Sequence, residues 1–149
     1  MKIGIGCDHG GYELKETIKE HLASKDIEVV DYGTYSKESV DYPVYGEKVA
    51  NAVVAEEVDY GIVVCGTGLG ISMAANKVKG IRAAVVSDCF SAEMSKAHNN
   101  ANILALGERV VGKGLALKIV DTWLNTEFEG GRHANRVDKI IQIENKHYK

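Results

Sequence analysis

The 149-residue sequence contains little cysteine, a single proline and few aromatic residues. Its three cysteines, Cys7, Cys65 and Cys89, are odd in number and form no CxxC pair, which argues against a disulfide scaffold or a cysteine-rich zinc module. Free thiols are typical of a reducing compartment, so we expect a cytoplasmic protein. The sequence also lacks an apolar run long enough to span a membrane, and Asp8 and His9 stand where a signal peptide would continue its apolar core.

A strong charge of either sign is also missing. The formal net charge of -3 favours neither nucleic acid nor a membrane surface as a partner, so an anionic ligand must be held by a local cluster of cations. Hydrophobic residues make up 45% of the chain and charged residues 26%, which is ordinary for a globular protein. We therefore expect residues 1–149 to form a single domain with one sizeable core.

Segments with strand character alternate with segments of helical periodicity along the whole chain. The expected strands are 2–6, 27–33, 60–65, 81–86 and 102–106. The expected helices are 11–25, 44–58, 70–78, 91–98, 113–125 and 133–147. This alternation predicts an α/β fold, a Rossmann-like three-layer sandwich whose five-stranded, mostly parallel sheet is covered by helices on both sides. Ligands of such sheets bind at the carboxyl ends of the strands, so the loops that follow the strands are the ones to search.

The loop after the first strand, CDHGG (7–11), has part of a dinucleotide-binding fingerprint. His9 stands where the third glycine of that fingerprint belongs, and its side chain would obstruct the close packing of helix on strand. We therefore expect no dinucleotide, although Asp31 ends the second strand. Asp8 and His9 are instead candidates for ligand contacts. Alternatively, Asp8 caps the first helix and His9 is a solvated loop residue.

The loop after the third strand reads CGTGLG (65–70) and frees a row of backbone amides. The predicted anion-binding nest consists of Gly66, Thr67, Gly68, Leu69 and Gly70. A Walker loop would need lysine after its second glycine, whereas Thr67 follows Gly66, so that class is excluded. A cysteine phosphatase loop would need arginine at position 71, which is Ile71.

Cys65 enters this loop at the end of an apolar strand. Fixed N–H donors at a helix N-terminus lower the pKa of a thiol from about 8.5 toward neutrality, which makes it a usable base or nucleophile. Alternatively, Cys65 is simply a small buried residue at the end of a strand, as free cysteines often are.

Further candidates follow the fourth and fifth strands. The segment AHNNANILALGERV (97–110) places His98 and Asn99 near the end of a helix and Arg109 just beyond a strand. Taken alone, His98 is equally consistent with a surface residue that compensates the dipole of its helix.

Arginine is scarce in this chain. Only four of its 18 basic residues are arginines, and two of them, Arg132 and Arg136, lie in GGRHANRV (130–137). Residues four apart share a helix face, and a pair of guanidinium groups suits a phosphate or a carboxylate. We favour this anion site over the alternative, a surface helix whose arginines pair with Asp138 and Glu144.

Five segments together resemble the signature segments of the type B ribose-5-phosphate isomerases. They are DHGG (8–11), DYP (41–43), CGTGLGISMAANK (65–77), HNNANILALGERVVG (98–112) and EGGRHANRV (129–137), in the order and spacing of that family. The resemblance spans nearly the whole chain and is more specific than any single glycine motif. It implies interconversion of ribose 5-phosphate and ribulose 5-phosphate through an enediolate, without a metal or an organic cofactor.

The resemblance also implies roles for the candidate residues. Cys65 would be the base that moves the proton between C2 and C1, and Thr67 with the amides of residues 66–70 would hold the oxyanion. His98 would be the acid that opens the furanose ring, with Asp8 nearby to assist. Contacts with phosphate, sugar hydroxyls or the enediolate would come from His9, Asn99, Arg109, Arg132 and Arg136.

In the family, each active site is assembled from two subunits. We therefore expect a homodimer or a dimer of dimers in which the C-terminal helix packs on a partner subunit. Some members replace the cysteine base by a carboxylate near position 71, where this chain has Ile71, so Cys65 must carry the role. The roles of Tyr42 and Cys7 stay open.

Two alternative functions also stay open. One is an isomerase of a hexose phosphate, such as allose 6-phosphate or galactose 6-phosphate, within the same superfamily. The galactose-6-phosphate branch lacks the full set of histidines and arginines, whereas His98 and GGRH (130–133) are intact here. The other is a non-catalytic sugar-phosphate sensor, which would not need a titratable thiol.

Overall fold

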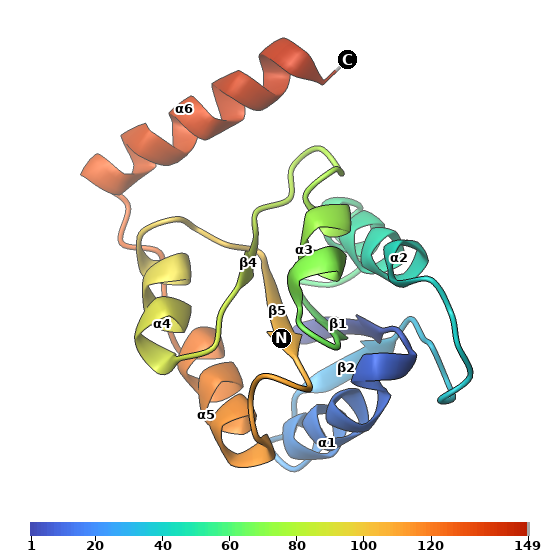
Figure 1. The fold of residues 1–149 in the computed structure, drawn as a ribbon. Coiled ribbons are helices and arrows are strands. Elements are labelled where there is room, and N and C mark those ends of the chain that lie inside the picture. The colour runs from blue at the N-terminus through green and yellow to red at the C-terminus, as the bar shows by residue number, and fades with distance from the viewer. Residues whose placement is uncertain (149) are drawn as a thin grey trace.

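The computed structural model describes residues 1–148 and contains a five-stranded parallel sheet (Figure 1). Its strands are β1 (Lys2–Cys7), β2 (Glu28–Asp31), β3 (Tyr60–Cys65), β4 (Ala83–Val85) and β5 (Ile103–Gly107). Their order across the sheet is β2-β1-β3-β5-β4, and every neighbouring pair is parallel. All strands therefore end at one edge, which we call the carboxyl edge, and begin at the opposite, amino edge.

Helices cover both sides of this sheet. They are α1 (Tyr12–Ala23), α2 (Tyr42–Val54), α3 (Leu69–Ala75), α4 (Cys89–Ala97), α5 (Lys113–Leu124) and α6 (Arg132–His147), with a short 3₁₀ helix, His9–Gly11, before α1. α1, α4 and α5 lie on one side, and α2 and α3 lie on the other (Figure 1). The predicted three-layer α/β fold is thus confirmed. Among residues 1–148, no helix combines the length and the apolar character needed to cross a bilayer.

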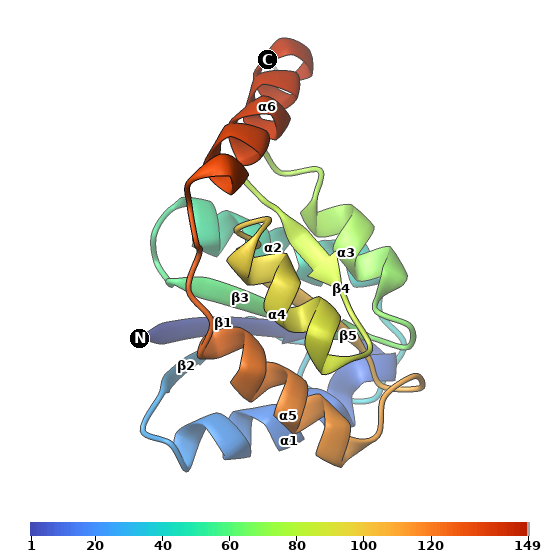
Figure 2. The same cartoon turned by 90° about the vertical axis from the view of Figure 1, so that its left-hand side faces the viewer.

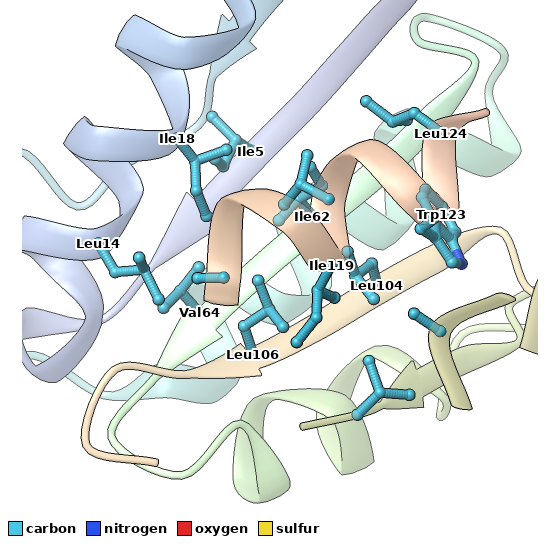
Figure 3. Close-up of a cluster of buried hydrophobic side chains, with 14 of the residues drawn as sticks. Ile5, Leu14, Ile18, Ile62, Val64, Leu104, Leu106, Ile119, Trp123 and Leu124 are labelled. Carbon is cyan, nitrogen blue, oxygen red and sulfur yellow. The ribbon is translucent and has the colours of Figure 1, made fainter. Parts of the chain in front are cut away.

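The side chains of β3 show how the two layers are filled. Ile62 and Val64 belong to the hydrophobic cluster shared with α1 and α5, whereas Val63 and Cys65 belong to the cluster shared with α2 and α3. Successive strand residues point to opposite sides, so a strand covered on both sides reads as an unbroken apolar run. Figure 3 shows the first of these clusters, in which Trp123 of α5 is fully buried.

The expected helices and strands are all observed, with ends shifted by a few residues. The helix predicted over 70–78 ends earlier, at Ala75. There the side chain of Asn76 replaces further helical bonds by pairing with the backbone of Ala83, donating to its oxygen at 3.0 Å and accepting from its nitrogen at 2.8 Å. A side chain that bonds backbone in this way competes with helix continuation.

The last helix, α6, projects beyond the body of the molecule, as two perpendicular views show (Figures 1 and 2). Near its C-terminal end, Glu144 accepts a hydrogen bond from the amide of Gly80. Ile140 and Ile143 are 46% and 61% exposed, and a cavity of about 540 Å³ separates them from Ile81. The helix therefore presents apolar side chains that the rest of the chain does not cover.

Candidate active site

Three loops that contain glycine meet at the carboxyl edge of the sheet. The three segments are 8–11 after β1, 66–70 after β3, whose last two residues begin α3, and 107–109, which starts with the last residue of β5. A Cβ atom built on Gly11 would lie 2.5 Å from the carbonyl oxygen of Val64, and one on Gly107 would lie 2.5 Å from the carbonyl carbon of Thr67. Glycine is therefore required here because neighbouring backbones approach each other too closely for a side chain.

The thiol of Cys65 lies at the entrance to the loop that follows β3. Its Sγ accepts a hydrogen bond from the amide of Gly68 at 3.1 Å, and the residue is only 5% exposed. Gly68 has φ +78°, in the left-handed region, and a Cβ atom there would lie 2.8 Å from the carbonyl carbon of Leu106. Glycine at this position therefore allows the loop to fold back toward the sulfur.

Residues 66–70, which we call the amide loop, present backbone N–H groups without partners. Within residues 1–148, the amides of Gly66, Thr67 and Gly70 donate no hydrogen bond. The hydroxyl oxygen of Thr67 accepts from the amide of Leu69 at 3.3 Å, which helps to hold the loop in shape. Free amides beside a sulfur form a site suited to an oxyanion.

Asp8 and His9 are both anchored by backbone hydrogen bonds. Asp8 Oδ1 accepts from the amides of Gly10 at 2.9 Å and Gly11 at 3.2 Å, so it caps the short 3₁₀ helix before α1. His9 Nδ1 accepts from the amide of Val40 at 3.1 Å, so the ring is not a freely solvated loop residue. Its Nε2 is the nitrogen that remains for a ligand.

Arg109 and Tyr42 flank the amide loop. A Cβ atom built on Gly66 would lie 3.3 Å from Arg109 Nη1, and one built on Gly70 would lie 2.6 Å from the ring of Tyr42. Both side chains are exposed, and a cavity of about 280 Å³ opens beside Thr67. The guanidinium group therefore adds positive charge next to the free amides, and Tyr42 lines the same loop.

Cys7 ends the strand next to β3 but lies in a different environment. It is fully buried, and burial raises the pKa of its thiol to about 12, although the nearby charge of Lys15 opposes this. A thiol with such a pKa stays protonated at neutral pH and is not available as a base. Of the two cysteines at strand ends, only Cys65 lies beside the amide loop.

A second polar group lies at the amino edge of the sheet. His98 caps the C-terminal end of α4 and His133 lies in the first turn of α6, and their rings stack with centroids 4.0 Å apart. Glu129 lies beside both, with carboxylate oxygens 3.6 Å from the Nε2 of each ring. Burial lowers the pKa of His133, and the neighbouring His98 and Arg132 lower it further. We call His98, Glu129 and His133 the histidine cluster.

The other predicted residues of this group surround the histidine cluster. Arg132 and Arg136 lie on α6 and are exposed, as is Asn99 after the end of α4. The amide of Glu129 donates to the carbonyl of Ala97 at 2.9 Å, which ties the start of α6 to α4. The amino edge therefore carries two imidazoles and two guanidinium groups close together.

The predicted site residues thus form two groups at opposite edges of the sheet. The carboxyl edge holds Asp8, His9, Cys65, residues 66–70 and Arg109. The amino edge holds His98, Asn99, Arg132 and Arg136, because α4 runs back from the end of β4 to the start of β5. One chain does not bring the two groups together.

Glu129 and His133 are candidates that the sequence reasoning misses. Both lie in the EGGRHANRV segment (129–137), which is the signal that the sequence offers, although Glu129 precedes α6. Their contact with His98 depends on how α6 packs against α4, which no local pattern reveals.

The fold and its glycine loops are those of an α/β protein that binds a small anionic ligand at the ends of its strands. A family profile described as Ribose/Galactose Isomerase matches residues 3–140, and the chain belongs to that family. The resemblance found in the sequence is thereby confirmed.

Individual relatives agree with this assignment. Ribose-5-phosphate isomerase B of Escherichia coli (strain K12) is 54% identical over 145 residues, which cover 97% of each chain. The structure of ribose-5-phosphate isomerase B from Clostridium thermocellum is similar with a TM-score of 0.98 and 65% identity, and 99% of each chain is covered. That of ribose-5-phosphate isomerase B from Mycoplasma genitalium with bound ribulose-5-phosphate has a TM-score of 0.92, 46% identity and 97% coverage of each chain.

Proposed function

We propose that this chain is an aldose–ketose isomerase that interconverts ribose 5-phosphate and ribulose 5-phosphate. The observation that carries the proposal is the Cys65 thiol, held 3.1 Å from the Gly68 amide beside free N–H groups. Isomerisation of this kind needs a base next to a site for the developing oxyanion, and the carboxyl edge offers that combination. The ribulose-5-phosphate bound to the Mycoplasma genitalium relative supports this choice of ligand.

In the proposed reaction, the thiolate of Cys65 removes the proton from C2 of the open-chain aldose. The electron pair forms the C1–C2 double bond of the enediolate, and the negative charge on O1 is stabilised by the free amides of the loop. The thiol then returns its proton to C1, and the hydroxyl proton of O2 ends on O1. Each fixed donor of this kind contributes about 3–4 kcal/mol to transition-state stabilisation. The base must stay reduced, which supports a cytoplasmic location.

We further propose that each active site combines the carboxyl edge of one copy with the amino edge of a second copy. The separation of Cys65 from His98 within one chain supports this, because the two roles must meet on one substrate. The exposed Ile140 and Ile143 of α6 would pack on the second copy. Residues 1–149 of each copy would form a single domain. Phe90, which is 71% exposed near the carboxyl edge, offers matching apolar surface. A homodimer with two equivalent sites is the simplest assembly of this kind.

Residues at the two edges then divide the remaining work. His98 of the second copy donates a proton to the ring oxygen as the bond from C1 to that oxygen breaks, and the proton of the C1 hydroxyl passes to solvent as the aldehyde forms. Asp8 orients the sugar with its second carboxylate oxygen. The groups proposed to bind phosphate, hydroxyls or the enediolate are His9, Asn99, Arg109, Arg132 and Arg136. No metal or organic cofactor takes part in this scheme.

The test is direct conversion of the substrate. Protein treated with a chelator is mixed with ribose 5-phosphate, and the formation of ribulose 5-phosphate is followed, with allose 6-phosphate and galactose 6-phosphate in parallel. We expect turnover of the pentose phosphate that exceeds turnover of either hexose phosphate. Turnover of a hexose phosphate alone would replace the proposed substrate, and binding without turnover would make the protein a sugar-phosphate sensor.

A further inference from the structure

The histidine cluster has the composition and spacing of a transition-metal site. The oxygens of Glu129 lie 3.6 Å from the Nε2 of His98 and 3.6 Å from the Nε2 of His133. One donor atom from each of the three residues lies within 4.8 Å of the other two. Two imidazoles and one carboxylate form a ligand set that Zn²⁺ accepts, with a fourth position left for water or another ligand.

We propose that His98, Glu129 and His133 bind a divalent transition-metal ion of the Zn²⁺ class. Tetrahedral bonds of about 2.0–2.1 Å place neighbouring donor atoms about 3.3 Å apart. The two separations of 3.6 Å run to different oxygens of Glu129, and with one donor atom per residue the three lie within 4.8 Å of one another, so the set must contract by up to about 1.5 Å. The stacked rings must also tilt toward each other, and the side chain of His98, which is 36% exposed, has room to do so.

The three ligands are already held near one another by the fold. The amide of Glu129 donates to the carbonyl of Ala97 at 2.9 Å, one residue before His98. His133 follows Glu129 by four residues, and its side chain is only 10% exposed. Ligands that are positioned before binding lose less conformational freedom when the ion arrives.

The charges around the cluster act in both directions. Glu129 brings one negative charge to the ion, whereas Arg132 and Arg136 repel it. Both arginines are exposed, so solvent and salt screen their repulsion. We therefore expect one ion per chain, bound through the three named side chains.

Metal binding has a consequence for catalysis, and this part rests on the proposed function. The ion occupies the imidazole nitrogen of His98 that ring opening requires. Zn²⁺ should therefore inhibit the isomerase, and a chelator should restore its activity.

The site is tested by titrating Zn²⁺ into the chelator-treated full chain in a calorimeter, with the visible absorption of tetrahedral Co²⁺ as a second readout. Neither measurement depends on enzymatic activity. We expect Glu129→Gln and His133→Asn each to weaken binding by at least about tenfold. His147→Asn, which changes an exposed histidine at the far end of α6, serves as the matched control and should bind like the wild type. Cys65→Ser should also bind normally, which separates this site from the thiol.

Each result decides the question. The site would be overturned if the wild type bound no Zn²⁺, or if Glu129→Gln and His133→Asn bound Zn²⁺ as tightly as the wild type. Glu129 is exposed, so an unchanged melting temperature of Glu129→Gln without metal shows that a loss of binding is not a loss of fold. A protein that binds Zn²⁺ but does not isomerise ribose 5-phosphate keeps the site and loses the proposed function. An active isomerase that binds no Zn²⁺ loses only the site.

Discussion

The Sγ atom of Cys65 lies 3.1 Å from the amide nitrogen of Gly68, in a turn that requires glycine. The contact places the sulfur beside the unpaired amides of Gly66 and Thr67 before any ligand binds. Donors that are fixed in advance stabilise a developing charge without reorganising during the reaction. Variants of this contact are therefore the first tests of the proposed chemistry.

Cys65→Ser should retain sugar-phosphate binding but lose turnover. A hydroxyl is a far weaker acid than a thiol, so it cannot supply the base at neutral pH. We expect kcat to fall between about 100-fold and 10,000-fold, the range for removal of a general base, with ligand affinity by calorimetry nearly unchanged. An unchanged kcat would remove the thiol from the mechanism.

Cys7→Ala is the matched control for that variant. Cys7 also ends a strand, but burial raises the pKa of its thiol to about 12. We expect kcat to stay within about twofold and the protein to lose about 1–2 kcal/mol of stability, as is usual when a small buried group is removed. A loss of kcat as large as that of Cys65→Ser would contradict the assignment of the base to Cys65 alone.

Gly68→Ala should damage the amide loop. The residue has φ +78°, and the added Cβ would lie 2.8 Å from the carbonyl carbon of Leu106. We expect a loss of at least about 1–3 kcal/mol in the free energy of unfolding, measured by denaturant titration, together with a lower kcat. Gly114→Ala is the control, because its Cβ has nothing within 4 Å and lies in a helix. If both variants lose the same free energy of unfolding, the left-handed turn at Gly68 does not require glycine.

Arg132→Ala and Arg136→Ala should weaken substrate binding more than they slow the chemical step. A charge-assisted hydrogen bond contributes about 1.5–3 kcal/mol, so we expect KM for ribose 5-phosphate to rise about 10-fold to 100-fold. Lys146→Ala removes a positive charge from the exposed far end of the same helix and should leave KM unchanged. An effect confined to kcat would show that the arginines do not hold the phosphate in the ground state.

Lys96 should make stability depend on pH. It is 3% exposed, its Nζ donates to the carbonyl of Trp123 at 3.2 Å and lies 3.8 Å from the ring centre of Tyr60. Burial lowers its pKa to about 8, with Glu127 opposing the shift. The unfolded chain keeps this proton up to about pH 10.4 and so binds more protons than the folded chain between these values. Stability therefore rises with pH across this window.

Lys96→Met isolates this contribution because other titrating groups cancel in the comparison. Between pH 7.5 and pH 10, we expect the wild type to gain about 2–3 kcal/mol in unfolding free energy relative to the variant. Parallel stability curves for the two proteins would show that Lys96 keeps an ordinary pKa in the fold.

The sheet was predictable because its central strands are apolar along their whole length. β3 and β5 are buried on both sides, so their apolar sequences, YGIVVC and ILALG, identify them as strands without reference to the elements that pack on them. That the glycine loops after these strands lie together was predictable for a second reason, because parallel strands end at the same edge of the sheet.

Buried charge was not predictable in the same way. Lys15 sits in a helical pattern where a lysine indicates solvent, yet it is fully buried and its Nζ donates to both carboxylate oxygens of Asp31 at 2.8 Å. Its partner comes from β2, and only the packing of α1 on the sheet brings the two together.

The site was predictable at one edge and only partly at the other. Spacing indicated that Arg132 and Arg136 share a helix face, but the stacking of His98 on His133 depends on where α6 leaves the body of the fold. Likewise, the contact of Tyr42 with Gly70 joins α2 to α3 and is visible only in three dimensions.

The most direct test of the central claim is the activity of a mixed assembly. Cys65→Ser and His98→Asn chains are expressed together with different tags, and particles that carry both tags are purified and assayed with ribose 5-phosphate. Each variant alone should be nearly inactive, whereas a mixed dimer contains one site with an intact Cys65 and an intact His98. We therefore expect about half of the wild-type activity per dimer. Mixed particles no more active than the separate variants would contradict an isomerase site built from two copies of this chain.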